Sequence, residues 1–320
     1  MVGYPEALTD PSYHGQLLCL TYPLIGNYGV PDDEIIDKMS RVFESDRIHI
    51  NGLIVSDYCE QPYHWDCART LGDWLTAHEV PALCGIDTRA LTRHLRHDGT
   101  MSGKIVFDDD VEFYDPNRED LMPKVSIGEP VLYGDGAKRI CLVDCGAKHN
   151  IVRCLLKRGV SVLRVPHDWP IFENKDKFDG IVFSNGPGDP KRAIAAIETA
   201  REAMARKIPS LGICLGNQLL ALAGGADTYK LKYGHRGQNQ PCVEVGTPRC
   251  YITTQNHGFA IHRDAMPRGF SVWFENANDG TVEGIIHKSE KFLSVQFHPE
   301  ANAGPYDTEY IFDTFLKKIR

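Results

Sequence analysis

The segment "GICLGNQLLALAGGA" (Gly212–Ala226) decides the expected fold, because a short apolar strand turns into an apolar helix within a few residues. The preceding letters "IPSL" extend the strand, and the helix ends at a pair of glycines. Cys214 lies at the turn, between Gly212 and Gly216. Most buried cysteines act only as small hydrophobic residues. The surrounding sequence must therefore show whether this thiol is structural or a nucleophile.

Strand and helix patterns alternate around this segment. Apolar strands are predicted at "RICLVDCG", "VSVLRVP" and "FDGIVFSNGPGDP", and helices at "KHNIVRCLLKRG" and "RAIAAIETAREAMARK". This alternation predicts an α/β domain with a doubly wound, mostly parallel sheet over residues 139–320. Strand-rich segments follow, including "RCYITTQNHGF" and "FLSVQFHPE", and "DTEYIFDTFLKKI" predicts a closing helix.

A smaller mixed α/β domain is predicted for residues 1–133. It contains strand candidates at "GQLLCLTYP" and "INGLIVSDY", and a helix from Asp87, as N-cap, to Gly99. The Gly-rich stretch "LYGDGAKR" (Leu132–Arg139) predicts a linker at residues 134–138.

Composition excludes several classes of function. The chain of 320 residues carries a net charge of -8 with no basic stripe, which argues against a nucleic-acid partner. No apolar run reaches the roughly 18 residues of a membrane span. The ten cysteines show no CxxC pair and no Cys/His ligand spacing, so we expect no disulfide scaffold and no metal site. The cysteine usage favours a cytoplasmic protein.

Three motifs are expected to meet at one edge of the sheet, because ligands bind at the carboxyl ends of parallel strands. They are "SNGPGDP", "GICLGNQ" and "QFHPE". Cys214 resembles a nucleophile elbow with Cys in place of Ser, at a helix N-terminus that favours the thiolate. His298 is a candidate acid and base, and Glu300 a candidate orienting carboxylate. A strand-like i, i+2 spacing predicts that both side chains lie on one side.

Two further segments are candidates for substrate binding. Gly186 and Gly188 expose backbone N–H groups that, with the N–H of Leu215, suit an oxyanion hole. The segment "TTQNHGFAI" (Thr253–Ile261) either holds the polar head of an amino acid or forms a polar hairpin turn. The pattern of this segment alone leaves both interpretations open. At Gly186 and Gly188, a simple strand-to-helix turn also stays open as the alternative to an oxyanion hole.

Together, "GICLGNQ", "SNGPGDP", "QNHGF" and "SVQFHPE" resemble a class I glutamine amidotransferase domain. The segments "GYPEALTDPSY", "LTYPLIGNYG", "GIDTRALT" and "GHRGQNQPC" resemble the glutamine-hydrolysing small subunit, or N-terminal region, of carbamoyl phosphate synthetase. The resemblance covers essentially the whole chain and is greatest to fused eukaryotic forms, with a lean toward the urea-cycle type.

The resemblance implies a mechanism. Cys214 would form a glutamyl thioester, His298 would transfer protons and Glu300 would orient His298. Backbone N–H groups of Gly188 and Leu215 would form the oxyanion hole. The positions that match glutamine-binding residues are Ser12, Gly186, Gly188, Leu215, Gln218, Asn256, Gly258 and Phe259.

The resemblance also implies the partner. Ammonia would pass to a large synthetase subunit or fused synthetase domains. That partner would use ATP, Mg²⁺ and bicarbonate, so this chain is expected to hold no cofactor. No Walker-type phosphate loop is found here, in keeping with that division.

The chain departs from the family pattern at two places. It starts about 35 residues later than most members, which would expose a sheet edge in the small domain. The missing residues could have held a mitochondrial transit segment, so the mitochondrial matrix stays an alternative location to the cytoplasm. Many members carry His where this chain has Asn217. That difference motivates an alternative function, a catalytically silent domain that acts as structural or regulatory partner of an ammonia-dependent synthetase. The pathway, pyrimidine or arginine and urea, stays open.

Overall fold

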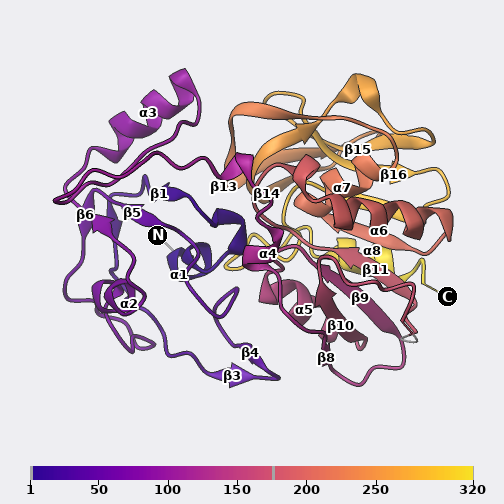
Figure 1. The fold of residues 1–320 in the computed structure, drawn as a ribbon, viewed down its shortest axis with the longest axis horizontal. Helices are drawn as coiled ribbons and strands as arrows, with labels where there is room; N and C mark the ends of the chain where they lie inside the picture. The colour runs from indigo at the N-terminus through magenta and orange to yellow at the C-terminus, as the bar shows by residue number, and fades with distance from the viewer. Residues whose placement is uncertain (1–2, 175–176, 320) are drawn as a thin grey trace. The chain divides into compact units, whose positions relative to one another are not determined.

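The computed structural model describes residues 3–174 and 177–319, and the chain divides into two compact units, Met1–Glu119 and Asp120–Arg320. Figure 1 shows the elements of each unit. The boundary lies before the predicted linker at residues 134–138, because β8 (Val131–Tyr133) pairs antiparallel with β10 (Ser161–Pro166). The residues just before the glycine-rich stretch therefore belong to the second sheet and not to the first domain.

The first unit is the predicted small mixed α/β domain. Its parallel sheet has the order β1 (Leu17–Cys19), β5 (Gly52–Ile54) and β7 (Ala82–Leu83). Short pairs are formed by β2 (Leu24–Ile25) with β6 (Asp57–Tyr58), and by β3 (Ile35–Ile36) with β4 (Met39–Ser40). The helices are α1 (Tyr4–Leu8), α2 (Leu71–Ala77) and α3 (Thr88–Asp98). Stacked rings of Phe43 and Trp74, with centroids 5.0 Å apart, lie in its apolar core.

Helix α3 has the ends that the sequence predicts. The side chain of Asp87 accepts a hydrogen bond of 2.8 Å from the backbone N–H of Ala90, as an N-cap does. Gly99 follows the helix with a φ of 101°, a conformation that favours glycine. The cap residues therefore set the length of this helix.

The second unit is built on a ten-stranded sheet of order β14-β13-β15-β16-β17-β12-β11-β9-β10-β8. Its parallel half consists of β9 (Arg139–Asp144), β10, β11 (Gly180–Phe183), β12 (Ser210–Ile213) and β17 (Phe292–Val295). Its antiparallel half contains β13 (Thr228–Glu244), β14 (Cys250–Ile261), β15 (Phe270–Asn276) and β16 (Val282–His287). The strands of the parallel half are buried on both faces, as their continuous apolar sequences predict.

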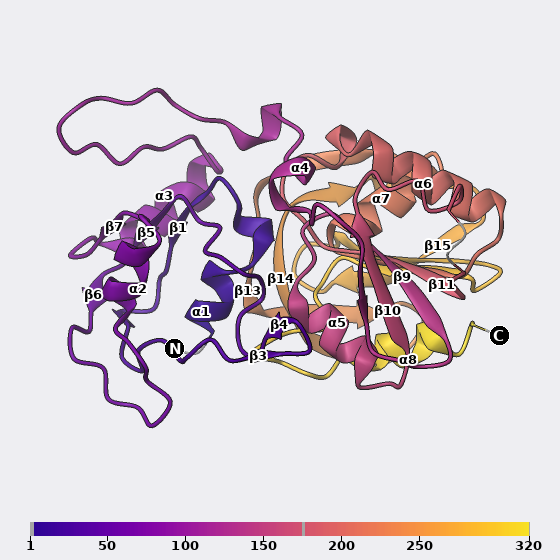
Figure 2. The ribbon, with the colours of Figure 1, turned by 60° about the horizontal axis from the view of Figure 1, so that its bottom comes forward.

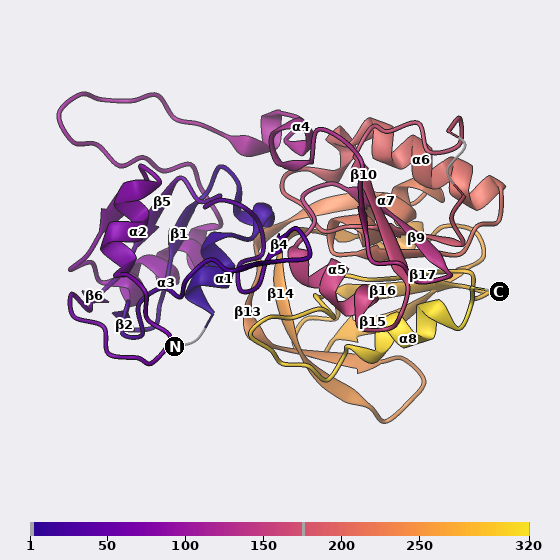
Figure 3. The ribbon, with the colours of Figure 1, turned by 90° about the horizontal axis from the view of Figure 1, so that it is seen from below.

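Helices cover both faces of the parallel half. Helices α6 (Ile194–Ala205) and α7 (Leu215–Ala223) lie on one face, and α5 (His149–Leu156) and α8 (Tyr310–Leu316) on the other (Figures 2 and 3). The short α4 (Met122–Val125) precedes β8. The unit is thus doubly wound, as predicted. Among the described residues, the helices lack the length and apolar character needed to cross a membrane.

Candidate active site

Cys214 occupies a strained turn between β12 and α7. Its φ of 54° and ψ of -102° lie outside the regions that side chains favour. A Cβ on Gly212 would lie 2.4 Å from the carbonyl oxygen of Gly216, and a Cβ on Gly216 would lie 2.1 Å from that of Phe183. Only glycine fits at either position. The tight turn that the sequence predicts around Cys214 is confirmed.

His298 and Glu300 form a buried pair beyond the end of β17. Nδ1 of His298 lies 2.7 Å from Oε1 of Glu300. Both residues lie in a turn after the strand, so the expected strand-like alternation is wrong and the turn itself brings the two side chains together. The ammonium of Lys148, also buried, lies 3.1 Å from the same carboxylate oxygen. Glu300 is therefore shared by two cationic partners.

The charges in this pair support each other. Burial by itself lowers the pKa of His298, but Glu300 and Cys214 reverse this effect and raise the pKa above its ordinary value. Burial would raise the pKa of Glu300, but Lys148 and His298 hold it well below its ordinary value. The arrangement favours a protonated imidazole beside an ionised carboxylate. Nε2 of His298 is buried and makes no hydrogen bond within the described residues, so it is free for proton transfer.

The thiol of Cys214 lies among polar groups. Its Sγ is 3.7 Å from the carbonyl oxygen of Asn256 and 3.6 Å from Nε2 of Gln296. Gln296 and Lys148 did not emerge from the sequence analysis. Gln296 stands inside "SVQFHPE", two residues before His298, so a signal for it was present. Lys148 follows β9 and had no such signal, because its partner Glu300 is distant in sequence.

Asn217 belongs to a buried network that reaches Cys214. Oγ of Ser294 donates to Oδ1 of Asn217 at 2.8 Å, and Nδ2 of Asn217 donates to Oε1 of Gln296 at 3.0 Å. Nε2 of Gln218 donates to the same Gln296 oxygen at 3.0 Å. Both polar atoms of Asn217 are therefore satisfied, and its presence removes none of the reacting groups.

The backbone donors lie where the sequence predicts them. Gly188 has a φ of 84° in the loop after β11, and Leu215 is the first residue of α7. A Cβ on Gly186 would lie 2.1 Å from the carbonyl oxygen of Cys145, so this loop packs too closely for any other residue. Within residues 3–174 and 177–319, neither Gly188 nor Leu215 donates its N–H to a protein acceptor.

The segment with Asn256, Gly258 and Phe259 is strand β14, so the hairpin-turn interpretation is wrong. Gln218 donates from Nε2 to the carbonyl oxygen of Phe259 at 2.8 Å, which ties α7 to this strand. Nδ2 of Asn256 is buried and has no hydrogen-bond partner in the described part of the chain. A buried donor without a partner is costly unless a ligand uses it.

Ser12 belongs to the first unit and is buried in a short helical turn, where its N–H donates to Oδ1 of Asp10 at 2.9 Å. Its expected contact with glutamine stays a prediction. The remaining predicted residues lie in the second unit.

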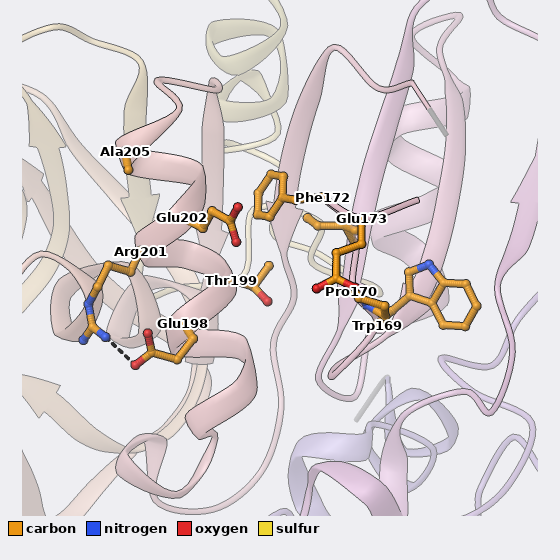
Figure 4. Close-up of a pocket in the computed structure, with 10 residues that line it drawn as sticks. Trp169, Pro170, Phe172, Glu173, Glu198, Thr199, Arg201, Glu202 and Ala205 are labelled. Carbon is orange, nitrogen blue, oxygen red and sulfur yellow. Dashed lines mark hydrogen bonds and ion pairs between the residues drawn. The ribbon is translucent and has the colours of Figure 1, made fainter. Parts of the chain in front are cut away.

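Two cavities of the second unit lie outside the cysteine turn. Figure 4 shows one of about 380 Å³ between α6 and the loop after β10, lined by Trp169, Phe172, Thr199 and Glu202 among others. None of its lining residues is a candidate catalytic group. The other, of about 470 Å³, is lined by residues that include Asn150, Tyr306 and Glu300. It lies beside α5 and includes Glu300 in its lining.

Comparison with known proteins agrees with this geometry. The model of the family "Glutamine amidotransferase class-I" matches residues 141–318, and that of "Carbamoyl-phosphate synthase small chain, CPSase domain" matches residues 1–105. A protein of Thermoplasma acidophilum described as a "putative gmp synthase subunit a protein" is similar in structure, with a TM-score of 0.50 and 29% identity over 57% of this chain and 93% of that one.

Curated relatives match over the whole chain. The multifunctional protein CAD of Squalus acanthias is 50% identical over 100% of this chain, which spans only 14% of that protein. The carbamoyl phosphate synthase arginine-specific small chain of Neurospora crassa is 44% identical over 100% of this chain and 73% of its own length. That of Saccharomyces cerevisiae is also 44% identical, over 100% and 81%. The chain therefore belongs to the carbamoyl-phosphate synthase small chain family, and its second unit is a class I glutamine amidotransferase domain.

Proposed function

We propose that this chain hydrolyses L-glutamine to glutamate and ammonia, and that the ammonia serves carbamoyl phosphate synthesis on a large synthetase partner. The observation that carries the proposal is Cys214 in a strained strand-to-helix turn beside the buried pair of His298 and Glu300. A nucleophile, a proton carrier and a group that orients the carrier are the parts that amide hydrolysis needs.

The first half of the reaction forms a thioester. The thiolate of Cys214 attacks the side-chain amide carbon of glutamine, and the carbonyl electron pair moves to the oxygen. The N–H groups of Leu215 and Gly188 stabilise that oxyanion. His298 gives its Nε2 proton to the amide nitrogen, the C–N bond breaks as the oxyanion collapses, and ammonia leaves.

The second half releases glutamate. A water molecule attacks the thioester carbon while His298, now neutral, takes one of its protons. The new oxyanion uses the same two N–H groups. When it collapses, the C–S bond breaks, and the thiolate of Cys214 and free glutamate result. Glu300, supported by Lys148, keeps Nδ1 of His298 protonated throughout, so that Nε2 carries the proton that moves.

The synthetase partner follows from the relatives. They are multifunctional proteins far longer than this chain, or small chains whose name implies a large one. We propose that ATP and Mg²⁺ act on that partner and that this chain needs neither for glutamine hydrolysis. The names of the relatives include both fused proteins and arginine-specific small chains, and they support no choice of pathway.

Glutamate release tests the proposal. The chain is incubated with L-glutamine, alone and with a carbamoyl phosphate synthetase large subunit freed of its own small subunit, and glutamate is measured. We expect turnover that rises when the large subunit is added and is lost in Cys214→Ala. Equal glutamate production by wild type and Cys214→Ala under both conditions would contradict the proposal and favour the silent domain.

A further inference from the structure

A second buried polar cluster lies in the antiparallel half of the sheet. His235 of β13 and His257 of β14 are register partners, with ring centroids 4.8 Å apart. Gln255 lies on the same face of β14, two residues before His257, and Glu283 reaches the pair from β16. All four side chains are buried. The mechanism proposed above uses none of them.

Four polar atoms of this cluster form a closed ring. Oε1 of Gln255 lies 3.0 Å from Nδ1 of His235 and 3.0 Å from Nε2 of His257. Oε1 of Glu283 lies 3.1 Å from Nδ1 of His235 and 3.8 Å from Nε2 of His257. Nitrogen and oxygen ligands held at about 2.0–2.2 Å around a tetrahedral cation are about 3.4 Å apart. The four edges of the ring bracket that value.

Both ring nitrogens of His257 face oxygens that can only accept hydrogen bonds. Its Nδ1 lies 2.8 Å from the carbonyl oxygen of Phe259, and its Nε2 faces Oε1 of Gln255. Both oxygens only accept, whereas a neutral imidazole has one N–H and one lone pair. A second proton would add a charge to a buried ring that packs edge-on against His235. While the His257 ring is neutral, one of its two contacts sets a lone pair against an oxygen.

Turning the Gln255 amide does not solve this by itself. Its Nε2 would then point at Nδ1 of His235, which would have to accept that hydrogen bond. Nδ1 of His235 would then present a lone pair to Oε1 of Glu283, 3.1 Å away. Without a cation, the bonds balance if the amide is turned and Glu283 is protonated, or if the amide stays as placed and both imidazoles carry two protons.

We propose that His235, His257 and Glu283 bind a divalent transition-metal cation, with the amide oxygen of Gln255 as fourth ligand. A cation among the four atoms would be bound by the lone pairs that otherwise face one another. The three side chains offer ligand atoms that lie within 4.8 Å of one another. Oε2 of Glu283 is buried and has no hydrogen-bond partner among the described residues, so the carboxylate is not otherwise fully used.

The second shell has the form that metal sites require. Metal-binding histidines donate their other N–H to a carboxylate or a carbonyl group. Nε2 of His235 lies 2.9 Å from Oδ2 of Asp279, and Nδ1 of His257 lies 2.8 Å from the carbonyl oxygen of Phe259. When both imidazoles are neutral, as metal binding requires, these bonds leave Nδ1 of His235 and Nε2 of His257 as lone pairs on opposite corners of the ring.

Two imidazoles with a carboxylate and an amide oxygen suit Zn²⁺ among abundant cations. Because the ring is buried, the cation would be structural. It would fix β14 beside Asn256 and Phe259, which belong to the proposed glutamine site. The sequence alone predicts no metal site, because these ligands come from three strands and show no regular spacing along the chain.

Zinc content tests the proposal. The full chain is prepared as Cys214→Ala, so that the nucleophilic thiol cannot bind metal, and without a histidine tag. It is loaded with excess Zn²⁺, freed of unbound metal by gel filtration, and analysed by elemental mass spectrometry. We expect about one zinc per chain. The zinc X-ray absorption edge should show only nitrogen and oxygen ligands at about 2.0–2.2 Å.

Three variants locate the cation. Glu283→Gln keeps the shape of the side chain and should weaken zinc binding by at least about 100-fold. Asp279→Asn is partly exposed, so it should fold, and should weaken binding by about 10–100-fold through His235. His262→Ala removes an exposed histidine outside the cluster and should leave the zinc content unchanged.

Less than a tenth of an equivalent of zinc in the loaded, folded chain would overturn the proposal and assign the cluster to an arrangement that additional protons hold together without a cation. Sulfur ligands in the absorption spectrum would also overturn it, as would zinc binding that neither Glu283→Gln nor Asp279→Asn weakens. None of these results depends on glutamine hydrolysis, so the proposed function stands or fails separately.

Discussion

Two buried ion pairs at the carboxyl edge of the same parallel sheet differ in how many of their polar atoms have hydrogen-bond partners. Asp144 at the end of β9 pairs with Arg164 of β10 at 2.8 Å and also accepts from the backbone N–H groups of Ile127, Gly146 and Ala147. In the pair His298–Glu300, Nε2 and Oε2 are buried and have no hydrogen-bond partner in the described part of the chain. The satisfied pair holds loops, whereas the unsatisfied pair is available for chemistry.

The unsatisfied pair matters only if it acts on Cys214. Replacing Cys214 with alanine should lower the rate of glutamine hydrolysis by at least about 10³-fold, because no other group forms the thioester. The free energy of unfolding should change by less than about 1 kcal/mol, since the residue is a small thiol in a strained turn. Steady-state glutamate production and urea denaturation measure the two effects. A Cys214→Ala variant that keeps a tenth of wild-type activity would contradict the assignment of Cys214 as the nucleophile.

Glu300→Gln should reduce kcat by about 10²–10⁴-fold, because the amide no longer stabilises the imidazolium or fixes its tautomer. The KM for glutamine should change little. The matched control is Asp144→Asn, which alters a carboxylate of the satisfied pair and should leave kcat within about threefold below its unfolding temperature. Equal losses of kcat in the two variants would show that the pairs do not differ in function.

Stability reports on the structural role of the satisfied pair. Asp144→Ala should lower the free energy of unfolding by about 3–5 kcal/mol, because it leaves the buried guanidinium of Arg164 without its charge partner. The double variant Asp144→Ala/Arg164→Met should be less destabilised than the single one, since no unpaired charge stays buried. Chemical denaturation of both gives the comparison. A double variant that is less stable than Asp144→Ala would contradict this account.

The stability of the folded chain should depend on pH through His298. The pKa of His298 is raised in the folded chain, so its stabilisation is complete below the unfolded pKa of about 6.5 and is lost as the pH rises through the folded pKa. The difference in unfolding free energy between wild type and His298→Gln should therefore be largest near pH 6 and shrink at alkaline pH. Denaturation at several pH values measures it, and a difference that grows with pH would contradict the charge assignment.

The smallest expected effect concerns Asn217. Asn217→Ala removes the donor to Gln296, whose Nε2 lies 3.6 Å from Sγ of Cys214. We expect kcat to fall by about tenfold, or about 1.4 kcal/mol, with the KM for glutamine unchanged. Steady-state kinetics give both constants. An Asn217→Ala variant with wild-type kcat would show that this network does not position the thiol.

The sequence alone was sufficient to predict the local structure wherever neighbouring residues along the chain determine it. The glycines around Cys214 required a tight turn, and Asp87 and Gly99 fixed the ends of α3. The alternation of strands and helices gave the doubly wound half of the sheet. His298 and Glu300 were found because they are two residues apart, although a turn and not a strand brings them together.

Contacts between distant segments were beyond the sequence. Lys148 reaches Glu300 from the loop before α5, and no periodicity links the two. The cluster of His235, His257 and Glu283 depends on the register of three antiparallel strands, which a single sequence does not reveal. The boundary between the units was placed too late because β8 is short and pairs with a strand later in the chain.

Covalent labelling shows whether Cys214 is an activated nucleophile within a formed glutamine site. The chain, which contains ten cysteines, is treated with a diazo-ketone analogue of glutamine, and intact mass and peptide mass are measured. The account predicts a single adduct on Cys214, slowed by L-glutamine and absent from Cys214→Ala. A folded chain that gives no adduct, or one labelled equally in Cys214→Ala, would contradict it.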